Sequence, residues 1–247
     1  DADCYPGQCV AEVIGMDDTI LDIDNKSLTN RPDLWGHYGI ARELAAIYKV
    51  PLNPVPDEKP DPSLPDFRID IEEPEKCSRF SALIIDGVDT RQAPAWMKTA
   101  VTNGGMRPIN AIVDITNYIM MAVGQPSHAY DFTHVDDHIV VRNAKEGEKL
   151  ILLDQSELDL TEGDLIICDK EEPLGLAGIR GGRKDSILPE TTKIVLEMAD
   201  FDAGTIRRTG KRFDQKTDAS IRYEKGIDTQ RIDQGISLAI KLFKEIF

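Results

Sequence analysis

A proline-rich stretch divides the chain and limits what can form on either side of it. Six prolines fall within residues 51–65, interspersed with Asp and Glu. Proline fixes its own backbone and has no N–H to donate, so this stretch favours extended conformation without helix or sheet pairing. We therefore predict a linker over residues 52–66, between a small unit over 1–51 and a larger unit over 67–247.

The residues before the linker predict one amphipathic helix. Between Asp33 and Tyr48, apolar residues recur at steps of three and four, which places them on one buried face. The members of this face are Leu34, Tyr38, Ala41, Ala45 and Tyr48. We therefore expect the first unit to be mostly helical.

Beyond the linker, short runs rich in β-branched residues are bounded by turn residues, as strands are. These runs begin at Phe80, His138, Lys149, Asp164 and Lys193. Helices are predicted over 108–124, 203–213, 217–226 and 229–247, with Thr217 as an N-cap. Because the strands cluster in mid-chain and helices flank them, we predict an α+β fold with a mixed, antiparallel-rich sheet.

Composition argues against a disordered, a collagen-like or a membrane-spanning chain. The 247 residues are 41% hydrophobic and 30% charged, and no apolar run approaches the roughly 20 residues of a transmembrane helix. With 29 Lys and Arg against 44 Asp and Glu, the net charge of −15 repels phosphate. Composition therefore does not indicate a nucleic-acid partner.

One stretch reverses this acidic balance. Residues 205–225 contain seven basic and three acidic residues. They could form a local phosphate-contacting strip, and solvated helix faces are the alternative. The candidates for such contacts are Arg180, Arg207, Arg208, Lys211 and Arg212.

The cysteines and the chain ends also carry information. None of the four cysteines has CxxC spacing, so reduced cytoplasmic thiols are expected instead of a zinc ribbon or a disulfide framework. The chain starts without Met and stops inside a helical pattern, which predicts a fragment of a longer protein.

The residues that could carry chemistry each have two interpretations. Residues 174–182 hold four glycines, so they are either a tight turn or a backbone loop that faces a ligand; they do not match a P-loop. His128 follows a predicted helix in an expected loop, where it is either structural or functional. His134 and His138 lie beside acidic residues, but a surface cluster is the preferred interpretation and no metal site is predicted.

Glu197 interrupts an apolar strand. Val195, Glu197 and Ala199 share one face, opposite Ile194, Leu196 and Met198. If both faces of the sheet are covered, Glu197 is a buried recognition group; if one face is wet, it is a solvated strand residue.

Several motifs occur in an order that resembles one known family. Residues 30–46 are similar to its NRPD-to-IAREL stretch, and residues 110–131 to its N-x-V-D-x-T-N-Y…GQP-x-HAFD block. Residues 174–182 and 217–226 are similar to its A-G-x-x-GG and TDAS-x-R-[FY]-E-[RK]-G motifs. The family is the beta subunit of bacterial phenylalanyl-tRNA synthetase.

The resemblance implies a particular organisation. Residues 1–51 would be the second half of the first module of that subunit, and 67–247 its fused third and fourth modules, the editing domain. No cofactor is expected in this chain, since ATP and Mg are used elsewhere in the synthetase. The expected partners are the phenylalanine tRNA and the alpha subunit of an α2β2 heterotetramer.

The resemblance also implies a site that hydrolyses tyrosine wrongly attached to the phenylalanine tRNA. Carried over by motif, the catalytic residues are His128, Asn117 and Thr116, and the substrate-binding residues are Glu197, Gly178, Gly181, Thr217 and Ala219. Tyr130 stands where Phe is usual and Lys225 where Arg is usual, and neither is expected to alter the pocket. The alternative is a non-catalytic module for tRNA docking and subunit interaction, inactive in isolation.

Overall fold

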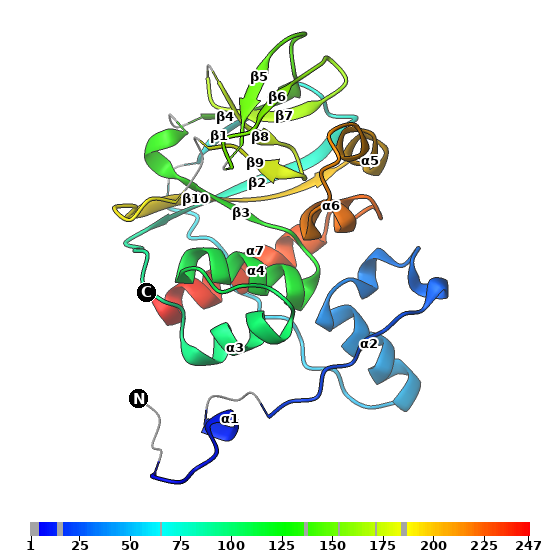
Figure 1. The fold of residues 1–247 in the computed structure, drawn as a ribbon, viewed down its shortest axis with the longest axis vertical. Helices are drawn as coiled ribbons and strands as arrows, with labels where there is room; N and C mark the ends of the chain where they lie inside the picture. Colours follow the sequence, from blue (N-terminus) through cyan, green and yellow to red (C-terminus); the bar gives the residue numbers. More distant parts are fainter. Residues whose placement is uncertain are drawn as a thin grey trace.

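The computed structural model describes residues 5–13, 17–64, 66–135, 138–152, 154–170, 172–183 and 187–247 (Figure 1). The α-helices within these ranges are α1 (Val10–Val13), α2 (His37–Tyr48), α3 (Ala95–Asn103), α4 (Ala111–Val123), α5 (Ala203–Arg212), α6 (Asp218–Tyr223) and α7 (Arg231–Ile246). Single 3-10 turns are η1 (Lys26–Leu28), η2 (Pro32–Leu34) and η3 (Phe132–His134). None of the described helices has the length and apolar character needed to cross a membrane.

The strands form two main sheets and a two-stranded ribbon. The strands are β1 (Arg68–Ile71), β2 (Cys77–Asp86), β3 (His128–Asp131), β4 (His138–Asn143), β5 (Lys149–Ile151), β6 (Glu157–Asp159), β7 (Leu165–Cys168), β8 (Pro173–Leu176), β9 (Arg180–Gly181) and β10 (Lys193–Phe201). One sheet has the order β1-β4-β7-β8-β9, the second β2-β10-β3, and β5 pairs with β6. Only the β1–β4 pairing is parallel among these described strands, which confirms the predicted α+β class with a mixed, antiparallel-rich sheet.

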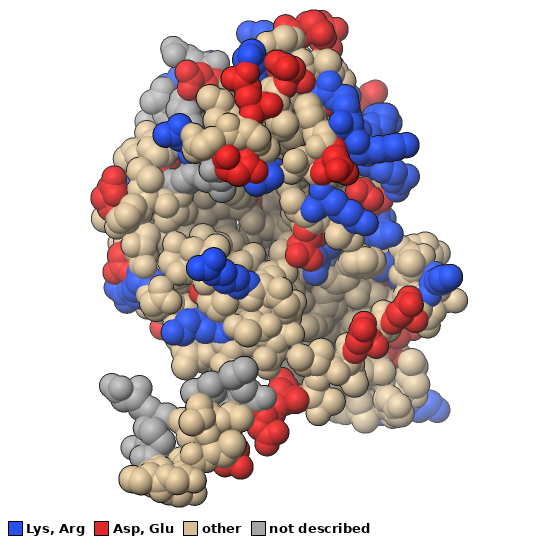
Figure 2. Space-filling view, viewed as in Figure 1, with Lys and Arg blue, Asp and Glu red and all other residues tan. Residues whose placement is uncertain are grey.

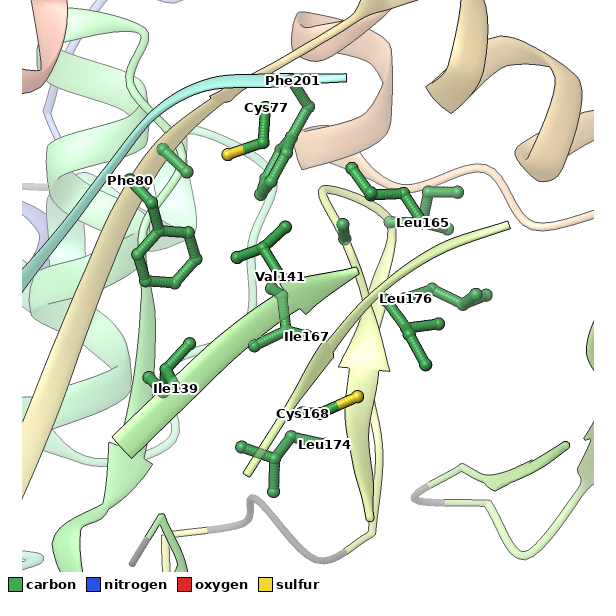
Figure 3. Close-up of a cluster of buried hydrophobic side chains, with 14 of the residues drawn as sticks. Cys77, Phe80, Ile139, Val141, Leu165, Ile167, Cys168, Leu174, Leu176 and Phe201 are labelled. Atoms are coloured by element: carbon green, nitrogen blue, oxygen red, sulfur yellow. The ribbon is translucent and has the colours of Figure 1, made fainter. Parts of the chain in front are cut away.

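The β2-β10-β3 sheet is the middle layer of the molecule. Its lower face in Figure 1 packs on α4 and α7, with α3 beyond them against α4, and its upper face packs on the five-stranded sheet. Each face has its own apolar core, and Figure 3 shows the upper one, where Phe80 and Phe201 meet Val141 and Ile167. The central strand β10 is therefore covered on both sides.

Helix α4 follows its local sequence signals. The Asn110 side chain accepts a hydrogen bond from the Val113 N–H (3.0 Å), and Gly124 ends the helix at φ +75°. Gly is favoured there because a left-handed conformation strains residues with a Cβ. The helix therefore begins at Ala111, three residues later than predicted.

The helix before the linker also differs from its prediction. Residues 32–34 form the turn η2, and α2 begins only at His37. The backbone is extended at Gly36, and a Cβ there would lie 2.5 Å from the Gly124 backbone nitrogen, so this close approach requires glycine. The predicted face is wrong in part, because Ala41 and Tyr48 are exposed.

Two arginines hold this N-terminal segment against the remaining structure. The Arg222 side chain donates to the Trp35 carbonyl (3.0 Å), and Arg231 donates both to the Pro32 carbonyl (3.5 Å) and to the Val123 carbonyl at the end of α4 (3.0 Å). Burial lowers the pKa of both guanidinium groups, but from so high a value that they stay charged at neutral pH. Between α2 and β1 the described residues contain no helix or strand.

Candidate functional site

Strand β10 places one carboxylate inside the middle layer. Glu197 is only 5% exposed, and its neighbours on the same face, Val195 and Ala199, belong to the core shared with the five-stranded sheet. Ile194, Leu196 and Met198 point into the helix-side core. Because both faces are covered, Glu197 is a buried group and not a solvated strand residue.

Strand β3 brings two aromatic side chains to Glu197. His128 is the direct partner of Glu197 in the antiparallel register, so it begins a strand and does not lie in the expected loop. Tyr130, two residues on, shares this face, and its hydroxyl donates a hydrogen bond to Glu197 Oε2. The His128 and Tyr130 rings meet edge to face, with centroids 4.7 Å apart.

The glycine-rich segment is a hairpin whose turn approaches the same place. Residues 173–176 and 180–181 pair as β8 and β9, and Gly178 in the turn has φ +66°. A Cβ on Gly178 would lie 2.9 Å from ring carbons of both Phe201 and Tyr223. The position therefore requires glycine for its conformation and for space. The segment is a tight turn, as one interpretation has it, and its backbone borders a cavity.

Helix α6 supports this turn from outside. The Thr217 hydroxyl donates to the Ile179 carbonyl (2.9 Å) and accepts from the Ser220 N–H (3.1 Å) in a capping box, as its N-cap role predicts. One side chain thus begins the helix and fixes the turn. It acts on the cavity through the backbone of Ile179.

These elements line a cavity of about 90 Å³ that is open to solvent on one side. It is lined by Pro126, Ser127, His128, Tyr130, Ile167, Gly175, Leu176, Gly178, Ile179, Arg180, Gly181, Glu197, Ala219 and Tyr223.

Burial keeps two groups near the carboxylate neutral. It raises the pKa of the Tyr223 hydroxyl well above its usual value, and the charge of Glu197 adds to this effect. The same two causes raise the pKa of the Cys77 thiol to about 12. Neither group is therefore an anionic nucleophile at neutral pH.

The structure brings six of the residues singled out from the sequence to this cavity: His128, Glu197, Gly178, Gly181, Ala219 and Arg180. Thr116, Asn117 and Thr217, which are all described, do not line it. Thr116 is buried on α4 and donates to the Val113 carbonyl (2.7 Å), and Asn117 follows it on the same helix.

The other basic candidates lie on α5, where Lys and Arg side chains gather on one flank of the molecule (Figure 2). Arg207 donates to the Glu224 carbonyl (2.9 Å), and Arg208 to the Thr205 hydroxyl (3.0 Å). Arg212 forms an ion pair with the buried carboxylate of Asp164. Lys211 is exposed on the same helix.

No metal site is found among the described residues. His138 Nε2 lies 2.8 Å from Asp70 Oδ2, a contact between β4 and β1. Two of the acidic residues beside His134 and His138, namely Asp136 and Asp137, lie outside the described residues. The described free thiols are those of Cys9, Cys77 and Cys168.

Sequence reasoning missed the part that Tyr130 and Tyr223 play in the cavity. Both line it, and the Tyr223 hydroxyl points to the Pro126 carbonyl at 3.5 Å. The one available signal was the phenol at position 130, since a buried tyrosine hydroxyl needs a polar partner.

Comparisons with known proteins agree with the motifs. Residues 76–247 match the family model described as the B3/4 domain. The chain is 42% identical to the phenylalanine--tRNA ligase beta subunit of Solibacter usitatus (strain Ellin6076) over 93% of the chain, and 38% identical to that of Aquifex aeolicus (strain VF5) over 97%. In both cases it spans only 30% of the relative.

Among solved structures, the chain is similar to an N-terminal fragment of the phenylalanyl-tRNA synthetase beta-subunit from Pyrococcus horikoshii. The match has 15% identity and a TM-score of 0.43, and covers 77% of this chain and 60% of that one. By the family match and the curated relatives, the chain belongs to the B3/4 domain family and is similar over nearly its whole length to a segment of phenylalanine--tRNA ligase beta subunits.

Proposed function

We propose that this chain is an editing module that hydrolyses the ester of tyrosine wrongly attached to the phenylalanine tRNA. The observation that carries the proposal is the buried Glu197 carboxylate, which lines a cavity beside a glycine turn and accepts a hydrogen bond from a phenol. The names of the relatives, phenylalanine--tRNA ligase beta subunits, support the phenylalanine tRNA as the nucleic-acid part of the substrate, and the tyrosine ester follows from the resemblance to that family.

Discrimination between tyrosine and phenylalanine depends on one hydroxyl. A tyrosine ligand donates its hydroxyl to Glu197, whereas phenylalanine covers the carboxylate without offering a donor. A buried polar group that loses its partner costs roughly 1 to 3 kcal/mol, and more when it is charged. The glycines of the turn leave room for the ring, and Ala219 limits the size of the cavity.

Hydrolysis of the ester requires an oriented water and support for the developing oxyanion. His128 lies beside Glu197 at the cavity wall, where it positions the terminal adenosine and the water. Thr217 supports the site through the turn that it fixes, whereas Asn117 and Thr116 lie on α4 outside the lining of the cavity and have no step in this scheme. No side chain becomes acylated in this scheme.

Binding of the tRNA is a separate requirement. The exposed residues of α5 and Arg180 at the cavity supply local positive charge on an acidic chain. Since the net charge is −15, we expect weak, salt-dependent tRNA binding by this chain alone, with more affinity from the rest of the α2β2 synthetase. Aminoacylation with ATP and Mg belongs to that larger assembly.

The test is deacylation of Tyr-tRNA and Phe-tRNA by the assembled synthetase that carries this segment. Replacing Glu197→Ala is expected to reduce the preference for Tyr over Phe esters by roughly 10- to 100-fold, from the cost of one unpaired group. Replacing His128→Ala is expected to slow turnover of Tyr-tRNA. Glu190→Ala, an exposed glutamate away from the cavity, is the matched control.

An unaltered Tyr/Phe ratio in Glu197→Ala would rule out its role as hydroxyl reader, and unchanged turnover in His128→Ala would remove that residue from the mechanism. The same assay on the isolated chain tests the alternative function, a non-catalytic module for tRNA docking and subunit interaction. If free tyrosine is released only by the assembled synthetase, the isolated module is a docking element that depends on its partners.

A further inference from the structure

Tyr130 is held so that its hydroxyl stays on Glu197. Its side chain is only 1% exposed, and the edge-to-face contact with His128 limits rotation of the ring. In the antiparallel register Tyr130 faces Val195, so it reaches Glu197 as a diagonal neighbour on the same face. The donor is therefore part of the cavity wall, whether or not a ligand is present.

The effect of this donor depends on what fills the cavity. Before a ligand binds, water can reach Glu197, because this residue lines the cavity. A ligand side chain displaces that water. The Tyr130 hydroxyl then still supports the carboxylate, and this support matters most for a ligand that brings no hydroxyl of its own.

We propose that Tyr130 is a specificity-determining residue: its hydroxyl positions Glu197 and lowers the cost of admitting a side chain without a hydroxyl. The inference rests on the proposed editing function. It implies a compromise, because the residue that orients the carboxylate for tyrosine also makes phenylalanine less unfavourable. Loss of the hydroxyl should weaken binding of both side chains, and of phenylalanine more.

The experiment compares the parent with Tyr130→Phe, in the assembled synthetase. KM and kcat are measured for deacylation of Tyr-tRNA and Phe-tRNA, and calorimetry gives the affinities of the non-hydrolysable 3′-amide analogues of tyrosyl- and phenylalanyl-adenosine. We expect both affinities to fall and the Tyr/Phe ratio to rise about threefold to tenfold, the range of one net hydrogen bond. Tyr48→Phe removes a hydroxyl from an exposed tyrosine and is the matched control.

A structural defect would weaken both ligands by the same factor, so an unchanged or reduced ratio in Tyr130→Phe would overturn the proposal. The background Glu197→Gln provides a second test. There the substitution at 130 should no longer change the ratio, and a change of the same size as in the parent would also overturn it. If the parent releases no tyrosine, the editing function fails, but the calorimetric ratios still decide the role of Tyr130.

Discussion

The two faces of the β2-β10-β3 sheet have different compositions and different tasks. Towards the helices, β10 presents Ile194, Leu196 and Met198, all nearly inaccessible and packed in one apolar core. Towards the five-stranded sheet it presents Glu197 between two apolar residues, beside a cavity. Because successive side chains alternate, one strand contributes packing on one face and, in the proposed function, recognition on the other.

A second carboxylate makes the comparison sharper. Asp114, near the start of α4, is also buried, with no exposed surface against 5% for Glu197. Its Oδ1 accepts from the Ile109 N–H (2.8 Å), but its buried Oδ2 has no hydrogen-bond partner among the described residues. Glu197 borders a cavity and accepts a phenol hydroxyl, whereas the hydrogen bond that the described residues give Asp114 comes from the backbone of Ile109.

The largest effect is expected on the free energy of unfolding, from a change in the helix-side core that should leave the Tyr/Phe specificity unaltered. Leu196→Ala removes a side chain that is 1% exposed in the helix-side core, so the free energy of unfolding should fall by about 2–5 kcal/mol. Urea denaturation measures this change, with the exposed Leu64→Ala as a control that leaves stability nearly unchanged. The Tyr/Phe ratio of the folded variant should match the parent. A shift as large as that of Glu197→Ala would show that the two faces are coupled.

A smaller effect is expected from the glycine turn on the cavity face. Gly178→Ala imposes a strained φ and a clash with two aromatic rings, so we expect a loss of about 1–3 kcal/mol in stability and weaker binding of the tyrosyl analogue. Gly226→Ala is the matched control: its φ is +80°, but a Cβ there meets nothing within 4 Å. Denaturation and calorimetry on both variants separate strain from the clash. Equal losses would mean that closeness to Phe201 and Tyr223 has no role.

The sequence predicts the locally encoded parts of this site well. Strand β10 was expected from its apolar run, and the N-cap roles of Thr217 in α6 and the stop at Gly124 in α4 follow from single residues. The sequence alone does not decide whether Glu197 is buried, because its burial depends on whether a second layer covers the strand. That layer comes from β4, β7 and β8, whose positions depend on long-range pairing.

The missed features also depend on tertiary contacts. His128 begins a strand only because β10 pairs with it 69 residues later in the chain. The hairpin of β8 and β9 contains glycines that disfavour strands in isolation, so it was expected to be a loop. The contact of Tyr130 with Glu197 crosses two strands diagonally, which no local pattern encodes. Helix α3 and strands β1 and β6 were not predicted either.

The smallest expected effect concerns Asp114 and depends on pH. Burial raises the pKa of this carboxyl, although the Ile109 N–H and Lys98 oppose the shift. A raised pKa means that the folded state binds protons more readily than the unfolded state. The parent should therefore gain stability as the pH falls from neutral through the raised pKa, until the unfolded-state carboxyl, near pH 3.8, is also protonated.

Asp114→Asn removes the charge but keeps an oxygen that can accept from Ile109. The variant should melt a few degrees higher than the parent at neutral pH, and this difference should shrink as the pH is lowered towards 4. Melting curves across that range measure it, with the exposed Asp57→Asn as the control. A variant less stable than the parent at neutral pH would mean that the Asp114 charge is needed on the helix face as well. In that case the Asp114 carboxylate would not be destabilising, and the proposed difference between Asp114 and Glu197 would be contradicted.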